Sequence, residues 1–142
     1  MSVYKHVLIG LDLSEESLIV MQKAKQIAEI HSARVSIAHV VEPLAFAYGG
    51  DVPLDMSEAQ TIVEEQANIR LEKILAESGV SAEKKFVVVG QTSNELHRLA
   101  KEHEADLIIV GSHGRHGLAL LFGSTANGVL HGAHCDVLAI RV

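Results

Sequence analysis

Residues 106–125 read DLIIVGSHGRHGLALLFGST, an apolar run that passes into a segment rich in glycine. The run is short, contains Ile and Val, and ends at a glycine, which is typical of a buried strand. Similar runs predict strands at Val7–Leu11, Arg34–Val41, Lys85–Val89, Asp106–Gly111 and Val137–Val142. Segments of helical period lie between them, at Glu15–His31, Ser57–Ser78, Ser93–His103 and Ser124–Gly132. This alternation predicts βαβ units and a parallel sheet with helices on both faces.

Helix starts and ends are marked by capping residues. Ser14 precedes Glu15-Glu16 before the first helix, and Thr92-x-x-Glu95 has the spacing of a capping box. Asp55-x-x-Glu58 has the same spacing before the second helix. Glycines 79, 90 and 132 are expected at element ends.

The composition limits the classes of function. Of 142 residues, 48% are hydrophobic and 4% aromatic, so the core must consist mainly of aliphatic side chains, as in buried parallel sheets. A net charge of −6 gives no basic surface for nucleic acid. No apolar run approaches the roughly 20 residues of a membrane span. A chain of 142 residues is expected to form one domain, over residues 1–142. Its single cysteine, Cys135, allows no disulfide within the chain, so a reducing, cytoplasmic location is expected.

The glycines that follow the fourth predicted strand indicate a ligand site. Gly111, Gly114 and Gly117 allow the backbone to turn sharply and to approach a ligand without intervening Cβ atoms. In open α/β sheets, ligands bind beyond the carboxyl ends of the strands. The alternative is that these glycines only shape a connection between strand and helix.

The start of the last predicted helix favours the ligand interpretation. Gly123, Ser124 and Thr125 offer backbone N–H groups and two hydroxyls at a helix N-terminus, where an anion is stabilised. Arg115 could add a charge-assisted bond to a phosphate. The P-loop pattern and the dinucleotide pattern Gly-x-Gly-x-x-Gly after the first strand are both absent from the sequence. We therefore predict that Gly111–Thr125 binds the phosphate end of a nucleotide.

Two stretches resemble the universal stress protein family. The opening Tyr4–Ser17, YKHVLIGLDLSEES, is similar to the start of that family, and GSHGRHGL at 111–118 with GSTAN at 123–127 resembles its nucleotide loop. The resemblance covers essentially the whole chain. It implies a three-layer α/β fold, Rossmann-like and adenine nucleotide alpha hydrolase-like, with an open parallel five-stranded sheet in the order 3-2-1-4-5.

The resemblance also implies a binding site and a ligand. The acidic residue that ends the first strand contacts the nucleoside, a backbone group at the end of the second meets adenine, and the loop holds ribose and phosphates. The implied nucleotide-binding residues are Gly10, Leu11, Asp12, Val41, Val110, Gly111, His113, Gly114, Arg115, Gly123, Ser124 and Thr125. Only eight residues, Arg115–Phe122, separate Gly114 from Gly123, one fewer than in the ATP-binding pattern. AMP, ADP and ATP, the last with Mg²⁺, therefore remain open.

The expected role is a regulatory stress-response module with little or no turnover. By the same resemblance it is a homodimer that pairs through the last strand, Val137–Val142. One alternative is a slow nucleotide phosphohydrolase, with weak ATPase activity, in which His113 polarises a phosphate or aligns water. The other is a nucleotide-free protein that acts through its dimer surface.

Several residues suggest chemistry that we do not predict. The pairs His113/His116 and His131/His134, the latter beside Cys135, have the spacing of metal ligands, but the final helix separates them by about 10 Å. We therefore expect no metal site. Cys135 is expected to be a small buried side chain rather than a redox centre. His39 is expected to be a hydrogen-bonded core histidine.

Overall fold

The computed structural model describes residues 3–43, 56–112 and 124–142. Its elements follow one another as β1 (His6–Gly10), α1 (Ser17–His31), β2 (Arg34–Val41), α3 (Met56–Ser78), β3 (Lys84–Val89), α4 (Thr92–Glu102), β4 (Leu107–Gly111), α5 (Ser124–Leu130) and β5 (Asp136–Ile140). The strands form a five-stranded sheet in the order β3-β2-β1-β4-β5, and all four pairings are parallel. The predicted fold class and strand order are confirmed.

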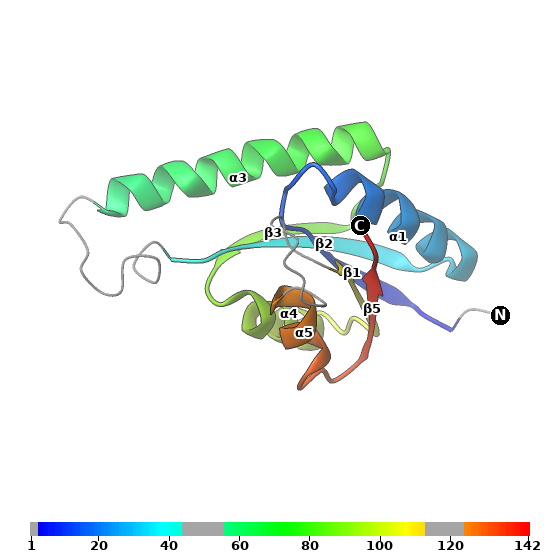
Figure 1. Cartoon of the computed structure of the whole chain (residues 1–142). Coiled ribbons are helices and arrows are strands. Elements are labelled where there is room, and N and C mark those ends of the chain that lie inside the picture. Colours follow the sequence, from blue (N-terminus) through cyan, green and yellow to red (C-terminus); the bar gives the residue numbers. More distant parts are fainter. Residues whose placement is uncertain (1–2, 44–55, 113–123) are drawn as a thin grey trace.

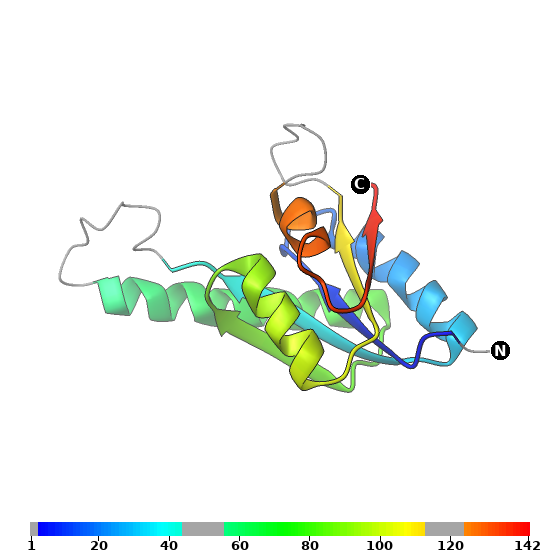
Figure 2. The same cartoon turned by 90° about the horizontal axis from the view of Figure 1, so that it is seen from below.

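The helices form a layer on each face of the sheet. Figure 1 shows α1 and α3 on one face and α4 and α5 on the other, with α3 extending beyond the ends of the strands. Figure 2, seen from below, shows α4 and α5 crossing in front of the sheet. The helices therefore cover the two faces of the sheet, and the turn that follows β1 lies at its carboxyl end.

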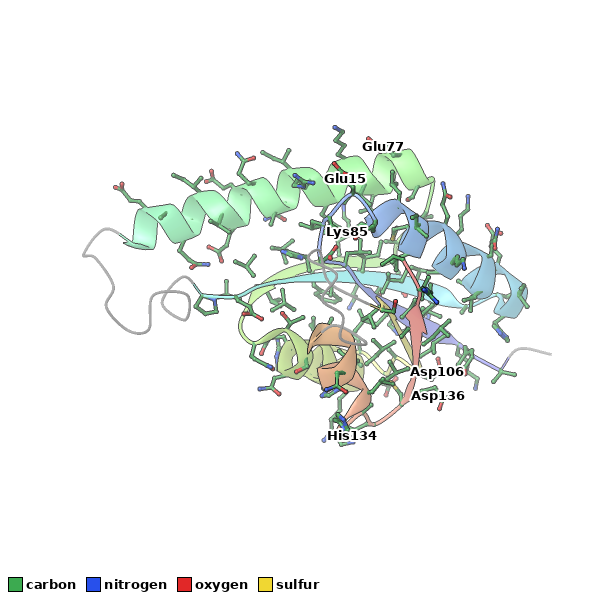
Figure 3. All side chains as sticks on the ribbon, viewed as in Figure 1. Glu15, Glu77, Lys85, Asp106, His134 and Asp136 are labelled. Atoms are coloured by element: carbon green, nitrogen blue, oxygen red, sulfur yellow. The ribbon has the colours of Figure 1, made fainter. Side chains whose placement is uncertain are left out.

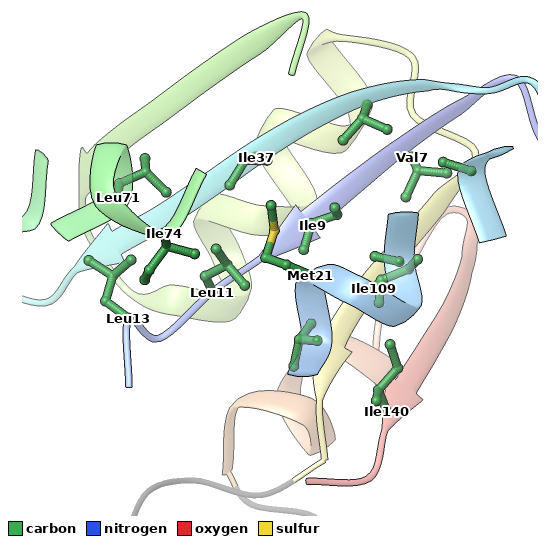
Figure 4. Packing of buried hydrophobic residues seen from close by; sticks show 14 of the residues in the cluster. Val7, Ile9, Leu11, Leu13, Met21, Ile37, Leu71, Ile74, Ile109 and Ile140 are labelled. Carbon is green, nitrogen blue, oxygen red and sulfur yellow. The ribbon is translucent and has the colours of Figure 1, made fainter. Parts of the chain in front are cut away.

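Alternation along each strand divides the core into two clusters. On the α1 and α3 face, Ile9, Ile37 and Ile109 lie against Met21, which is fully buried (Figure 4). On the α4 and α5 face, Leu8 and Ile108 pack with residues of α4. Because β1 is central, its side chains are buried on both faces, as expected of a parallel sheet.

Element boundaries differ from the predicted ones by one or two residues. Only β2 has the predicted bounds, and β5 ends at Ile140 rather than Val142. α1 begins at Ser17 rather than Glu15, because residues 14–16 form a turn in which the Ser17 N–H donates to the Ser14 carbonyl (3.1 Å). α4 begins one residue early, at Thr92.

The capping of α4 differs from the prediction. The N-cap is Gln91, whose Oε1 accepts a hydrogen bond from the Asn94 N–H (2.9 Å). Thr92 therefore lies inside the helix, and its hydroxyl donates to Glu42 Oε1 (3.1 Å). The capping box at Thr92 and Glu95 is wrong because a neighbouring glutamine provides the acceptor. The other proposed box begins at Asp55, which lies outside the described residues.

Gly79 and Gly132 have positive φ angles, of 70° and 80°. Both follow a helix, α3 and α5, in the left-handed conformation that ends helices. The prediction that glycines mark these two helix ends is confirmed.

Candidate functional site

The carboxyl ends of β1 and β4 lie side by side at the point where the strand order reverses. β1 connects to β2 on one side, whereas β4 follows α4 on the other side of β1. Gly10 and Gly111, both predicted site residues, end these two strands. Open α/β sheets bind ligands at such a reversal.

The turn after β1 is held to β2 through Leu11. The Leu11 N–H donates to the Ala38 carbonyl (2.9 Å), which continues the ladder one residue beyond β1. The Leu11 carbonyl accepts a hydrogen bond from Nδ1 of His39 (2.7 Å). Both backbone groups of Leu11 are therefore fixed, and its side chain is buried.

Asp12 lies in the next position, with its side chain exposed. Its Oδ1 accepts hydrogen bonds from the Ser14 N–H (2.9 Å) and the Ser17 hydroxyl (3.3 Å). Leu13 between them is buried and has a φ of 62°, an uncommon conformation for a residue with a branched side chain. The turn is therefore a strained backbone segment that the carboxylate of Asp12 helps to close.

The two strand-end glycines have different surroundings. A Cβ built on Gly10 would lie 2.9 Å from Leu96 Cδ1, so a side chain there would collide with α4. A Cβ on Gly111 would lie 3.4 Å from Val20 Cγ2, an ordinary contact, and the φ of Gly111 is not positive. Packing against Leu96 therefore favours a glycine at position 10, whereas among the described residues neither packing nor backbone conformation requires a glycine at 111.

Val41 and Val110 are core residues at the same end of the sheet. Their side chains are buried, at 4% and 2% exposed. The Val41 carbonyl accepts a hydrogen bond from the Gly90 N–H (3.0 Å), which leaves one lone pair of that oxygen for a ligand. A ligand can therefore meet these residues only through the backbone.

The glycine-rich segment is described only at its two ends. Gly111 ends β4, and α5 begins at Ser124, as predicted. The predicted site residues His113, Gly114, Arg115 and Gly123 lie outside the described residues. Ser124 and Thr125 are placed by their backbone, in the first turn of α5.

His39 is the residue at this edge whose role the sequence did not reveal. It is hydrogen-bonded and partly buried, as predicted for a core histidine. Burial lowers its pKa, and the opposing effects of the Leu11 carbonyl and the Asp12 charge are smaller. The signal that could have found the contact is its position two residues before the end of an apolar strand, beside the carboxyl end of β1.

The residues around Cys135 lie far from this edge, near the amino ends of β4 and β5. A hollow of about 220 Å³ is lined there by Lys101, Ile108, His134 and Cys135 among others, and it is smaller than most small-molecule pockets. Burial, with smaller effects of Asp136 and Asp106, raises the pKa of the Cys135 thiol, which stays protonated at neutral pH. Figure 3 places His134, Asp106 and Asp136 at this end of the sheet.

Within residues 3–43, 56–112 and 124–142, no three His, Cys, Asp or Glu side chains are grouped closely enough to bind a metal ion. No helix within the same ranges has the length and apolar character needed to cross a bilayer.

Comparison with known proteins places this geometry in context. The model of the universal stress protein family matches residues 3–141. Universal stress protein A homolog 2 of Coxiella burnetii is 40% identical over 146 residues, which cover 100% of this chain and 98% of the relative. A hypothetical protein whose biochemical function was assigned from its structure superimposes with a TM-score of 0.81 and 27% identity, over 98% of this chain and 96% of its own. A universal stress protein in complex with cAMP superimposes with a TM-score of 0.64 and 28% identity, over 99% and 98%.

The order of strands and the polar turn after β1 define an open, doubly wound α/β domain of the kind that binds ligands at its carboxyl edge. The match over nearly the whole length narrows the class further. The chain belongs to the universal stress protein family.

Proposed function

We propose that this protein binds an adenine nucleotide at the carboxyl edge of the sheet and acts as a regulatory module with little or no turnover. The observation that carries the proposal is that β1, which Asp12 follows by two residues, and β4, which Gly111 ends, are neighbours at the strand-order reversal. The chain is also 28% identical to a universal stress protein in complex with cAMP. The proposed nucleotide contacts are Gly10, Leu11, Asp12, Val41, Val110, Gly111, His113, Gly114, Arg115, Gly123, Ser124 and Thr125.

The turn at Asp12 supports a contact with the nucleoside. Both hydrogen bonds that Asp12 makes to described residues end on Oδ1, so Oδ2 can accept a further bond from a ribose hydroxyl. The side chain is exposed at the carboxyl edge. A carboxylate held in this way accepts hydrogen bonds strongly, because it is charged.

The number of phosphates is proposed to be one. The relative with the cAMP complex carries a nucleotide with a single phosphate. The eight-residue interval Arg115–Phe122 is shorter than the ATP-binding pattern, which favours a ligand with fewer phosphates. ADP and ATP, the latter with Mg²⁺, are the ligands to compare.

A homodimer is part of the proposal. β5 is an edge strand of the described sheet, and its Leu138 side chain is 37% exposed. An edge strand presents N–H and C=O groups to a second strand, and an exposed apolar side chain gains from being covered. We propose that two copies pair through β5.

The test is calorimetric titration of the full chain with AMP, cAMP, ADP and ATP, together with thermal unfolding. A nucleotide at a hundredfold excess over its dissociation constant would stabilise the fold by about 2.7 kcal/mol. Native mass spectrometry of protein purified without added nucleotide reports the bound ligand and the dimer together. Neither heat nor stabilisation with any of the four would refute the proposal, and phosphate release above background from ATP would make the protein a hydrolase.

Asp12→Asn tests the position of the site. The asparagine keeps an Oδ1 that can close the turn but loses the charge, so affinity should fall about five- to tenfold while stability changes little. Asp106→Asn is the control, because Asp106 accepts hydrogen bonds from the Lys5 and His6 N–H groups at the other end of the sheet. If both variants bind as tightly as the wild type, the site does not include Asp12.

A further inference from the structure

His39 lies on β2 and reaches across to the turn that follows β1. The strand pairing sets Gly10 beside Ala38, so that the next residues, Leu11 and His39, are neighbours. His39 Nδ1 lies 2.7 Å from the Leu11 carbonyl oxygen. A carbonyl can only accept, so Nδ1 carries the hydrogen. Burial lowers the pKa of His39, so the ring is neutral at physiological pH and this tautomer is the one present.

The bond to Leu11 fixes the direction of the following N–H. A peptide group is planar and trans, so the N–H of Asp12 points opposite to the Leu11 carbonyl. The carbonyl is directed at the His39 ring, and the Asp12 N–H therefore points away from that ring. Among the described residues, that N–H has no acceptor. An exposed donor at a strand-order reversal is suited to a ligand oxygen.

The backbone of the turn after β1 also needs interactions that keep its conformation. Leu13 adopts a φ of 62°, and such backbone strain persists only where the surroundings fix it. The Leu11 N–H bond to Ala38 fixes the peptide before Leu11, and the His39 bond fixes the peptide after it. The second bond comes from a side chain, and it can be removed by mutation without breaking the sheet.

We propose that His39 is a positioning residue of the binding site: its bond to the Leu11 carbonyl presents the Asp12 N–H, together with the Asp12 carboxylate, to an oxygen-bearing ligand. The proposal rests on the proposed nucleotide-binding function and deepens it. It assigns to His39 no contact with the ligand. The ligand group it predicts at the Asp12 N–H is a hydrogen-bond acceptor, a ribose or phosphate oxygen.

A matched pair of variants separates the effect of the hydrogen bond to Leu11 from the effect of side-chain volume at position 39. In His39→Asn, the side-chain amide lies close to the place of Nδ1 and can donate to the Leu11 carbonyl. In His39→Leu, the volume is similar and the donor is lost. His6→Asn is the control, because His6 is more deeply buried and also bonds a carbonyl, that of His103, but at the amino end of the sheet.

Two measurements on the full chain test whether His39 positions the turn after β1. Calorimetric titration with AMP and cAMP gives the affinity, and backbone amide exchange followed by NMR reports the Ser14 N–H, which is bonded to Asp12 Oδ1. We expect His39→Leu to weaken binding about tenfold and to raise the exchange rate of Ser14, and we expect His39→Asn to bind within about threefold of the wild type. His6→Asn should leave both readings unchanged.

The outcomes distinguish this inference from the proposed function. Wild-type affinity in His39→Leu, or an equal loss in both His39 variants, overturns the positioning role. If wild-type protein binds none of AMP, cAMP, ADP and ATP, the proposed function is refuted, and the exchange measurement alone decides whether His39 holds the turn. An unchanged Ser14 exchange rate in His39→Leu then overturns the inference as well.

Discussion

The two ends of the parallel sheet each contain a histidine bonded to a backbone carbonyl, but they use their polar groups differently. At the amino end, His6 is 2% exposed, and both of its ring nitrogens are bonded, Nδ1 to the His103 carbonyl (2.9 Å) and Nε2 to the Ser36 hydroxyl (2.7 Å). The Asp106 carboxylate beside it accepts hydrogen bonds from two N–H groups, those of Lys5 and His6. This is a closed network that holds the strands together.

At the carboxyl end, the polar groups are only partly used. Toward the described residues, His39 makes one hydrogen bond and Asp12 uses one carboxylate oxygen. Leu13 next to them is held in a strained conformation. Polar groups whose hydrogen bonds are all formed within the protein contribute to stability, whereas exposed groups with an unused donor or acceptor can bind a ligand. The difference indicates that the amino end is structural and that the carboxyl end is the place to look for binding.

The largest expected effect comes from breaking the closed network. His6→Leu removes both bonds and leaves the fully buried Ser36 hydroxyl and the His103 carbonyl unpaired, at a cost of about 2–4 kcal/mol in the free energy of unfolding. His39→Leu, which breaks one bond at a less buried site, should cost about 1 kcal/mol. Urea unfolding of the two variants measures both. A larger loss in His39→Leu would contradict the assignment of the two ends.

The second effect distinguishes the two strand-end glycines. Gly10→Ala would place a Cβ 2.9 Å from Leu96 Cδ1, and such overpacking costs about 1–3 kcal/mol. Gly111→Ala should change stability by less than about 0.5 kcal/mol, because its Cβ would make an ordinary contact with Val20.

A double variant checks the mechanism of that loss. Leu96→Ala in the Gly10→Ala background removes the colliding methyl groups. The double variant should therefore be destabilised by less than the sum of the losses in the two single variants. Strict additivity in thermal or urea unfolding would mean that Gly10 is required for another reason.

The third effect is the response to acid at the carboxyl end. The pKa of His39 is lowered in the folded chain, chiefly by burial, so the unfolded chain takes up a proton first as the pH falls. Its contribution to stability is complete above pH ~6.5 and is lost as the pH falls toward the folded pKa. Between pH 7.5 and 5, the wild type should therefore lose more stability than His39→Asn. Equal losses would show that His39 is not buried as described.

The fold could be predicted from the sequence because it depends on patterns within each segment. The run Arg34–Val41 is bounded by polar residues on one side and a proline-containing stretch on the other, and its strand has the predicted bounds. Helix starts were less predictable, because the capping groups compete. At α4, Gln91 accepts the Asn94 N–H and becomes the N-cap, one residue before the Thr92 of the capping-box pattern.

The sequence could predict which residues lie at the strand ends of the candidate site, but not the hydrogen bonds and packing contacts between them. Asp12 and Val41 could be placed at strand ends from the sequence and the family resemblance. The bond from His39 to Leu11 depends on the register of β1 and β2, in which Gly10 pairs with Ala38, and a sequence pattern does not specify the register of strands so far apart. For the same reason, the collision that requires Gly10 involves α4 and is invisible in the local sequence.

The smallest effect lies at the exposed margin of the amino end. Tyr4 donates a hydrogen bond from its hydroxyl to Asp136 Oδ2 (2.8 Å), and this bond, with the nearby negative charge, raises the pKa of Tyr4. Because the folded pKa lies above that of a free tyrosine, the contact contributes at neutral pH and is lost as the pH rises through the folded pKa. Asp136→Asn should lower the pKa of Tyr4 toward its ordinary value, measured by ultraviolet titration in a Tyr48→Phe background so that one tyrosine reports. If Tyr4 already titrates as a free tyrosine, the closed network at the amino end stops at Asp106 and does not extend to the edge strand β5.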